Sequence, residues 1–246
     1  MPKQDNRIGD RFLVKLSGEA LASPDNNIDP NALDAIGEEL ILAHIERPKI
    51  AVVVGGGNFY RSRTATAHNM GRVQADYVGM LATIMNAIIL QQWLEKRDVP
   101  SSALSAFPIS PLCEVYTPSK AIAQLESGSM VILAGGTGSP YFTTDTAASL
   151  RALEIGAALL IKATRVDGVY EQDPEQYPAA SKFDIIDFET VLSNRLSVMD
   201  TTAFIMCQEH RLAIRVLDIN VQGNLCRAVC GEDAGTLVTF RSTKID

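Results

Sequence analysis

The sequence has few of the residues that build metal and disulfide sites. Its 246 residues include four cysteines and three histidines. Cys226 and Cys230 lie four residues apart, a spacing that places both on one face of a helix, but no CxxC pair and no nearby histidine completes a zinc-ligand set. We therefore expect reduced, partly buried thiols, as in a cytosolic protein, rather than a zinc site.

The sequence also lacks an excess of positive charge and a long apolar run. Lysine and arginine number 22 against 29 aspartates and glutamates, and the formal net charge is −7. This balance argues against a general nucleic-acid or anionic-membrane binder. Residues 1–12 lack the apolar core of a signal peptide, and no apolar run approaches the ~18 residues of a membrane span. We expect a cytoplasmic protein with no nucleic-acid and no membrane partner.

No linker, charge block or internal repeat divides the chain. A composition that is 46% hydrophobic and 21% charged is ordinary for a globular protein with a sizeable core. We expect one domain over residues 1–246, with residues 1–10 forming a flexible N-terminus.

Apolar runs typical of buried strands alternate with helical patterns. Strands are predicted over 11–16, 50–54, 102–107, 130–134, 158–162, 213–219 and 237–240. Helices are predicted from Pro30 to before Pro48, over 72–97, from Pro118 through Leu125, from Thr144 or Asp145 as N-cap through Ile155, from near Asp187, and over 198–210. This alternation implies crossover connections and an α/β fold around a mainly parallel sheet.

The predicted helix over 72–97 has an unusually broad apolar face. Val73, Tyr77, Met80, Leu81 and Ile84 recur at helical spacing, and the pattern continues beyond them. A face this broad indicates either a subunit interface or a central buried helix.

A glycine-rich turn follows the apolar run Ile50–Val54. Gly55, Gly56 and Gly57 let the backbone turn sharply and leave its N–H groups uncovered, and Arg61 adds positive charge close by. Uncovered N–H groups at a strand-to-helix turn form an anion cradle, which predicts phosphate binding. The alternative is that the three glycines form only a tight turn.

Four predicted strands end in turns of this kind: Lys15–Gly18, Gly55–Arg61, Gly135–Asp145 and Lys162–Tyr170. The carboxyl ends of parallel strands lie at one edge of the sheet, where ligands of open α/β sheets bind. We therefore expect the four turns to converge on one site.

Two lysines and two aspartates are the candidates for chemistry at that site. Phosphoryl transfer depends on preorganised cations and N–H groups, and Lys15 and Lys162 stand at or beside two of the strand ends. Asp145 and Asp200 could orient a lysine or hold a metal-bound phosphate, although Asp145 could also be a plain N-cap and the lysines could be surface residues. Walker and protein-kinase motifs are absent.

Six segments of the sequence resemble the bacterial UMP kinases of the amino-acid-kinase superfamily. In order they are VKLSGEAL, VVVGGGNFYR, GMLATIMNA, GGTGSPYFTTD, KATRVDGVY and VMDTTAF, and the resemblance runs from about Arg11 to Leu237. It implies a single three-layer αβα sandwich and the reaction of ATP with UMP to give ADP and UDP, in pyrimidine nucleotide biosynthesis. It also implies Mg²⁺, bound with ATP mainly through the phosphates, and a homohexamer.

The resemblance also implies a set of site residues. ATP would be bound by Lys15, Leu16, Ser17, Gly18, Gly57, Arg61, Thr164, Tyr170 and Asp173. UMP would be bound by Gly56, Asp76, Thr137, Gly138, Ser139, Pro140, Tyr141, Phe142, Thr143 and Thr144. Lys15 and Lys162 would neutralise the transferring phosphoryl group, with Asp145 and Asp200 orienting them, and no residue would ligate a metal directly.

The sequence departs from the family at positions tied to regulation. Ser102 and Ser129 stand where family members often carry arginines linked to GTP activation, so we expect GTP to activate weakly or not at all.

Three alternatives remain open. A kinase acting on carbamate or an amino-acid carboxylate is disfavoured by Thr137–Asp145, and a non-catalytic nucleotide-binding protein by the presence of both Lys15 and Lys162. A dinucleotide-dependent oxidoreductase is disfavoured because the glycines lack GxGxxG spacing.

Overall fold

The computed structural model describes residues 10–60, 70–174 and 176–240, together with the backbone of residues 244–245. The strands, in chain order, are β1 (Phe12–Leu16), β2 (Ile50–Val54), β3 (Ser101–Ser105), β4 (Glu114–Val115), β5 (Met130–Ala134), β6 (Leu159–Thr164), β7 (Val169–Tyr170), β8 (Lys182–Asp187), β9 (Ala213–Asp218), β10 (Thr236–Thr239) and β11 (Lys244–Ile245). The helices are α1 (Pro30–Glu46), α2 (Arg72–Glu95), α3 (Pro118–Glu126), α4 (Thr144–Glu154), α5 (Phe188–Ser193), α6 (Thr201–Glu209) and α7 (Asn224–Cys230), with a 3-10 turn at Gly18–Leu21.

The strands form one sheet in the order β11-β8-β10-β9-β6-β1-β2-β5-β3-β4, with β7 paired to β8. The run from β9 to β4 is parallel throughout, whereas β10 on β9, β11 on β8 and β7 on β8 are antiparallel. Every residue of β2 and β5 is buried, as expected of strands covered on both faces. The predicted α/β fold with a mainly parallel sheet is confirmed.

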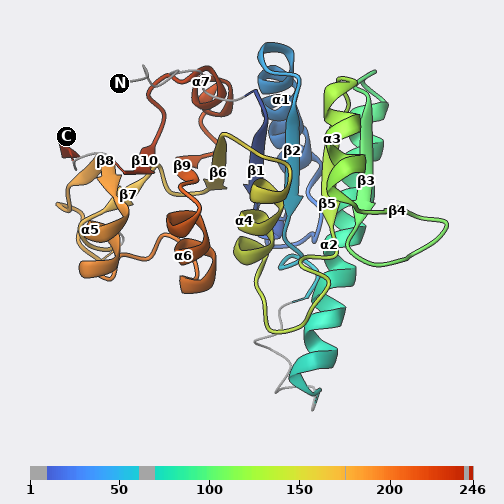
Figure 1. Cartoon of the computed structure of the whole chain (residues 1–246), viewed down its shortest axis with the longest axis horizontal. Coiled ribbons are helices and arrows are strands. Elements are labelled where there is room, and N and C mark those ends of the chain that lie inside the picture. The colour runs from blue at the N-terminus through green and yellow to red at the C-terminus, as the bar shows by residue number, and fades with distance from the viewer. Residues whose placement is uncertain (1–9, 61–69, 175, 241–243, 246) are drawn as a thin grey trace.

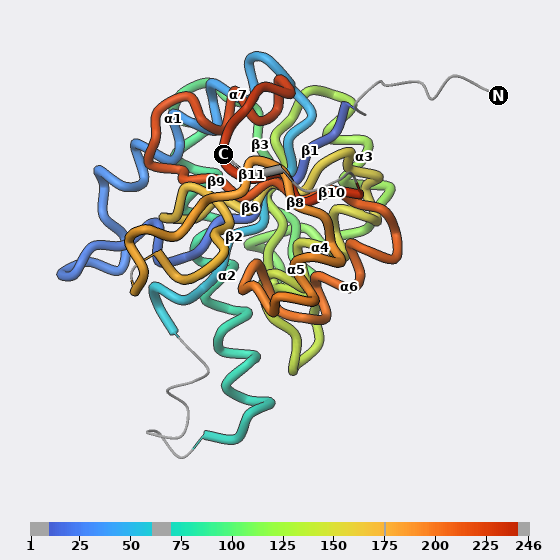
Figure 2. The backbone as a smooth tube through the Cα atoms, turned by 90° about the vertical axis from the view of Figure 1, so that its left-hand side faces the viewer, coloured from blue at the N-terminus to red at the C-terminus, as the bar shows by residue number. Residues whose placement is uncertain are grey.

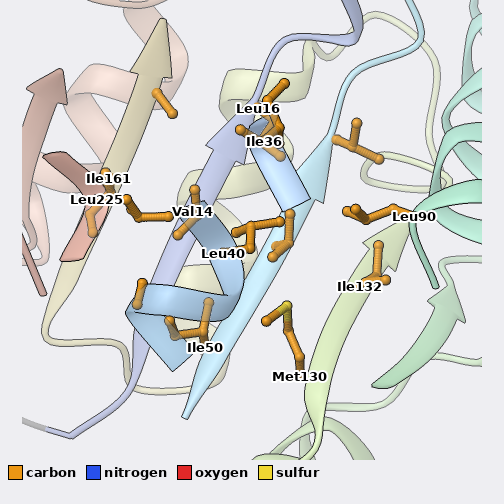
Figure 3. Close-up of a cluster of buried hydrophobic side chains, with 14 of the residues drawn as sticks. Val14, Leu16, Ile36, Leu40, Ile50, Leu90, Met130, Ile132, Ile161 and Leu225 are labelled. Carbon is orange, nitrogen blue, oxygen red and sulfur yellow. The ribbon is translucent and has the colours of Figure 1, made fainter. Parts of the chain in front are cut away.

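Successive side chains of β1 enter two different cores, one on each face of the sheet. Phe12, Val14 and Leu16 lie in the core that α1, α2 and α7 cover. Leu13 lies in the core on the opposite face of the sheet, which α3, α4 and α6 cover. Figure 3 shows Ile36 of α1 beside Leu16, and Leu40 of α1 beside Val14, in the first core. Helices therefore cover both faces of the sheet, and the architecture is a three-layer αβα sandwich (Figure 1).

The predicted helix starts are largely correct. The side chain of Asp29 accepts a hydrogen bond from the N–H of Asn31 at the start of α1, and that of Thr117 accepts one from Lys120 at the start of α3. α1 ends at Glu46, two residues before Pro48, because the residue preceding a proline disfavours helical backbone.

α2 is the longest helix, and its N-terminal end projects beyond the rest of the molecule (Figures 1 and 2). It buries Met80 and Ile84 against the sheet but exposes Tyr77, Leu81 and Met85, so its broad apolar face is part core and part surface. Among the described residues it is the one helix apolar and long enough to cross a membrane, with half of its most apolar stretch buried, a test that core helices also pass.

The far end of α2 is fixed to α1 by the only tryptophan of the sequence. The ring of Trp93 lies so close to Gly37 that a Cβ there would come within 2.2 Å of it. The indole Nε1 donates to Asp34 at 2.7 Å, and Arg97 pairs with the same carboxylate and stacks over the ring at 3.6 Å. This corner closes the α1–α2 side of the core.

Sequence reasoning missed β8 and α7 in the C-terminal part of the chain, as well as the two-residue strands β4, β7 and β11. β8 was not predicted, because the turn residues Asp173-Pro174 and Tyr177-Pro178 precede it and the strand itself mixes polar and apolar residues. α7 begins after Gly223, which has a φ of +79° and offers no side-chain cap. The four cysteines are free thiols, and Cys226 and Cys230 lie on α7.

Candidate functional site

The four turns predicted to converge follow four adjacent parallel strands. The order β6-β1-β2-β5 places their carboxyl ends side by side at one edge of the sheet. A cleft of ≈ 380 Å³ opens there between α2 and the loop that joins β5 to α4. Its lining comprises Glu19, Gly56, Gly57, Tyr60, Arg72, Asp76, Gly79, Met80, Thr83, Gly136, Thr137, Phe142, Thr143 and Thr144. We call it the acceptor cleft.

Lys15 and Lys162 meet on a single carboxylate. They are direct partners in the register of β1 and β6, so their side chains leave the same face of the sheet. The Nζ of Lys15 lies 2.9 Å from Oδ1 of Asp145, and the Nζ of Lys162 lies 2.8 Å from Oδ2. Lys162 also donates to the carbonyl of Val198. Two cations are therefore held at one fixed point beside the acceptor cleft.

Burial and charge act against each other in this group. Burial disfavours the ionised form of Asp145, but the two lysines outweigh it and hold the pKa of Asp145 below its usual value. Burial lowers the pKa of Lys162, with Lys15 adding to that effect and Asp145 opposing it. Asp145 also lies in the first turn of α4, where the helix dipole favours a negative charge.

The cap of α4 is Thr143, not Thr144 or Asp145 as predicted. Its hydroxyl accepts from the N–H groups of Asp145 and Thr146, which leaves the Asp145 carboxylate available to the lysines. Capping by the earlier residue is favoured because Thr143 has extended backbone, whereas Thr144 is already helical.

The side chain of Asp200 contacts the N-terminal ends of two helices and neither lysine directly. It caps α6 by accepting from the N–H of Ala203, and its carboxylate also accepts from the hydroxyls of Thr143 (2.5 Å) and Thr146 (3.1 Å). It therefore ties the N-terminus of α6 to that of α4. Lys162 is within reach of its charge, while the direct contacts of that lysine are Asp145 and Val198.

The glycine turn after β2 is packed against two neighbouring segments. A Cβ at Gly56 would lie 2.7 Å from the Cβ of Ala82 and from the carbonyl of Gly79, and a Cβ at Gly18 would lie 2.5 Å from the carbonyl of Gly55. Only glycine allows this close approach. The buried Asn86 donates to the carbonyl of Gly55 at 2.7 Å, so the turn is held from behind. Arg61 lies outside the described residues.

Asp76 is buried at the α2 wall of the acceptor cleft, with 9% of the residue exposed. Its carboxylate accepts from Nε of Arg72 at 2.8 Å and 2.9 Å, and from the N–H of Tyr141 at 2.8 Å. Tyr141 has a φ of +73°, a strained conformation for a non-glycine residue, and its ring lies beside the guanidinium of Arg72. Asp76 thus joins α2 to the β5–α4 loop.

The β5–α4 loop forms the opposite wall of this cleft. Gly135, Gly136 and Gly138 all have positive φ, and the N–H of Gly135 donates to the hydroxyl of Thr83 at 2.8 Å. Of the residues predicted to bind UMP, those that line the cleft are Gly56, Asp76, Thr137, Phe142, Thr143 and Thr144. Gly138, Ser139, Pro140 and Tyr141 belong to the same loop but not to the cleft lining.

Some of the residues predicted to bind ATP lie around a second cleft of ≈ 420 Å³. Tyr170 and Asp173 line it, together with the segment 194–197. We call it the second cleft. Thr164 ends β6, and its hydroxyl contacts the backbone of Val166, which also lines this cleft.

The other predicted ATP ligands among the described residues do not line the second cleft. Gly57 lines the acceptor cleft, Leu16 is fully buried, and Ser17 and Gly18 begin the 3-10 turn. For Leu16 only the backbone is accessible to a ligand.

Sequence reasoning missed Arg72, Thr83 and Asn86. Arg72 carries the one positive charge among the described lining residues of the acceptor cleft. All three sit on α2, with Thr83 and Asn86 inside the segment GMLATIMNA and Arg72 at the start of the helix. Polar side chains on a largely apolar helix were the available signal.

The chain is similar to known proteins over most of its length. The amino acid kinase family matches residues 10–218. A UMP kinase from Bacillus anthracis has a TM-score of 0.94 at 30% identity, covering 96% of this chain and 98% of that one. A UMP kinase from Ureaplasma parvum has a TM-score of 0.87 at 32% identity (93% and 98% covered), and a uridylate kinase from Archaeoglobus fulgidus 0.70 at 26% (93% and 100%). This chain, as its motifs predict, belongs to the amino acid kinase family.

Proposed function

We propose that this protein is a UMP kinase, which transfers the γ-phosphoryl group of ATP to UMP and yields ADP and UDP. The observation that carries the proposal is the pair Lys15 and Lys162 held on Asp145 between two clefts. The similarity to UMP kinases over nearly the whole chain supports the choice of acceptor.

In this proposal the acceptor cleft holds UMP. The N–H groups of the glycine turn at Gly56 face its phosphate, Asp76 accepts from ribose hydroxyls, and the loop from Thr137 to Thr144 surrounds the base. A carboxylate suits hydroxyl donors, and a loop rich in backbone N–H, C=O and threonine hydroxyls suits the polar edge of a pyrimidine. ATP occupies the second cleft, near Tyr170 and Asp173, and its γ-phosphoryl group points to the lysine pair.

Transfer then depends on charges that are already in place. Lys15 and Lys162 neutralise the negative charge that spreads over the moving phosphoryl oxygens, and the N-terminus of α4 adds a favourable dipole. Asp145 keeps both ammonium groups at the required positions, and Asp200 keeps α4 and α6 together. No general base is needed, because an ionised phosphate oxygen of UMP is the nucleophile.

Mg²⁺ fits this site as a companion of ATP. Within the described residues, no three His, Cys, Asp or Glu side chains are grouped to hold a metal ion. Asp145 is already engaged by two lysines. The metal would therefore be held mainly by phosphate oxygens, where it offsets their charge.

The proposal also covers the location, the assembly and the pathway of the enzyme. We infer a cytoplasmic homohexamer that acts in pyrimidine nucleotide biosynthesis. The exposed apolar residues Tyr77, Leu81 and Met85 of α2 support a contact between subunits, since an apolar patch on a surface helix commonly marks one. Light scattering on the purified protein tests the assembly.

A coupled assay of ADP release tests the reaction itself. UMP, CMP, dTMP, carbamate and acetylglutamate are offered in turn with ATP and Mg²⁺. We expect the highest kcat/KM with UMP. Turnover of carbamate or acetylglutamate but not UMP would assign the chain to another branch of the family. Nucleotide binding without any ADP release would indicate a non-catalytic protein.

A further inference from the structure

A buried arginine lies directly behind the acceptor cleft. Arg151 of α4 has 7% of its surface exposed, and its guanidinium lies over the ring of Tyr116 at 4.2 Å. Its Nη1 contacts Oε2 of Glu154 at 2.7 Å, and the hydroxyl of Tyr116 donates to the same oxygen at 2.8 Å. We call these three residues the Arg151 cluster. Within this cluster, Arg151 and Tyr116 both contact the carboxylate of Glu154, and Arg151 also stacks on the ring of Tyr116.

The cluster reaches the wall of the acceptor cleft through one nitrogen. Nη2 of Arg151 lies 3.4 Å from the carbonyl of Gly136 and 3.5 Å from that of Thr137. Both residues line the cleft. Gly136 and Gly138 have φ values of +60° and +83°, so this stretch adopts a conformation that regular secondary structure does not supply. The carbonyl of Gly135 accepts from the N–H of Gly138 within the loop, whereas those of Gly136 and Thr137 face Arg151.

Stability alone does not explain a charge at this position. Replacing a buried ion pair by apolar side chains of similar volume is often neutral or stabilising, because the charges lose their hydration. An apolar residue at position 151 could fill the space against Tyr116 equally well. What an apolar residue cannot do is donate to two carbonyls of the loop.

We propose that Arg151 is a positioning residue for the acceptor nucleotide. By holding the Gly136 and Thr137 carbonyls, it fixes the wall of the acceptor cleft that faces the base. The inference rests on the proposed function in so far as that cleft binds UMP. The donor nucleotide occupies the second cleft, which Arg151 does not line, so its binding is independent of this residue.

The test compares Arg151→Lys and Arg151→Met with Arg97→Lys. Arg97 is a matched control because it also stacks on an aromatic ring (Trp93) and pairs with a carboxylate (Asp34), but at the end of α2 away from the cleft. Losing a hydrogen bond from a charged group typically changes affinity about tenfold or more. We expect the KM for UMP to rise about tenfold in Arg151→Lys and further in Arg151→Met. We expect kcat and the KM for ATP to stay within about twofold, and Arg97→Lys to match the wild type.

A second measurement does not depend on turnover. Hydrogen exchange of amides in residues 135–143 reports directly on how firmly the loop is held. We expect faster exchange in Arg151→Lys than in the wild type or Arg97→Lys, with unchanged exchange in β1 and β2. If Arg151→Met fails to fold, Arg151→Lys carries the test, since it keeps a cation for Glu154.

The outcomes separate the two proposals. If the wild-type protein releases no ADP with UMP, the proposed function fails, and the exchange data still decide the role of Arg151. If UMP is a substrate, the inference about Arg151 fails when folded Arg151→Lys keeps the wild-type KM for UMP. It also fails when the KM values for UMP and ATP rise together, or when the loop exchanges at the wild-type rate.

Discussion

The two clefts on either side of the lysine pair are built differently. The acceptor cleft is walled largely by glycine turns and a strained loop, held from behind by the buried side chains of Thr83, Asn86 and Arg151. The second cleft is walled by surface turns, where Tyr170 donates to Asp167 and Asp167 pairs with Lys182. A wall fixed by buried contacts can reject a ligand that leaves its polar groups unpaired, so we expect selectivity to reside mainly in the acceptor cleft.

The largest effect on activity is expected from the lysine pair, which belongs to neither cleft. Lys15→Ala and Lys162→Ala should each lower kcat by roughly 10²–10³, the usual loss for one preorganised electrostatic contact. The KM values for UMP and ATP should change much less, because these charges act on the transition state. Steady-state kinetics measure both quantities.

Lys49→Ala is the matched control for these variants. Lys49 also forms ion pairs, with Asp10 and Glu126, but it precedes β2 at the amino edge of the sheet. It should keep the wild-type kcat. A near-normal kcat in Lys15→Ala or Lys162→Ala would remove that lysine from the proposed mechanism.

Changing the base of the acceptor nucleotide tests whether the fixed wall of the acceptor cleft makes the enzyme selective. UMP and CMP differ at one hydrogen-bonding edge, and we expect kcat/KM for UMP to exceed that for CMP by at least ~10²-fold, since a built polar pocket penalises an unpaired edge. Initial rates with each nucleotide at several concentrations give the ratio. Equal kcat/KM values for UMP and CMP would mean that the β5–α4 loop does not distinguish the two bases.

Two aspartates sharpen the comparison further, one that lines the acceptor cleft and one that contacts a residue of the second cleft. Asp76→Asn should weaken UMP binding about tenfold, as expected for losing one hydrogen bond to a charged group, and leave ATP binding unchanged. Asp167→Asn should do the reverse and to a smaller extent, because its partner Tyr170 lines the second cleft. Calorimetric titration of each variant with UMP and ATP separately gives the four affinities. If Asp76→Asn weakens both nucleotides equally, its bonds to Arg72 and Tyr141 are structural.

The smallest effect is expected from GTP, at a site that belongs to neither cleft. Ser102 lines a separate cavity of ≈ 580 Å³ with Gln91 and Lys120. Lys120 is paired with Glu114 at 2.7 Å, so this cation is already engaged and Ser102 offers no charge to a triphosphate. We expect less than ~twofold activation across a GTP titration at subsaturating ATP and fixed free Mg²⁺. A saturable rise of several-fold would show that other residues form an activator site.

The parts of the site carried by short local patterns could be predicted from sequence. The strands of Lys15 and Lys162 are continuous apolar runs, and the glycine turns follow them directly. Their meeting on Asp145 was implied only by the family resemblance and not by any local pattern, because it depends on the pairing register of strands that lie far apart in the chain. The same limit explains Asp200, which was expected at the lysines and instead contacts the threonines of α4.

The roles of Arg151 and Arg72 could not be predicted from the sequence for a related reason. Arg151 stands in an ordinary polar helix pattern, and its burial arises only when α4 packs beside Tyr116, from a segment more than thirty residues earlier. Arg72 lies next to a glycine at a helix start, where a basic residue is normally solvated. In both cases tertiary packing, rather than local propensity, sets the role of the residue.

The lone tryptophan gives the molecule a built-in optical probe. Trp93 is 7% exposed, lies under Arg97 and fits against the bare backbone of Gly37. Its emission therefore reports whether α1 and α2 are still in contact, with no competing indole elsewhere in the sequence. Since this corner lies at the end of α2 away from the nucleotides, a fluorescence change on adding UMP would reveal that ligand binding is felt along the whole helix.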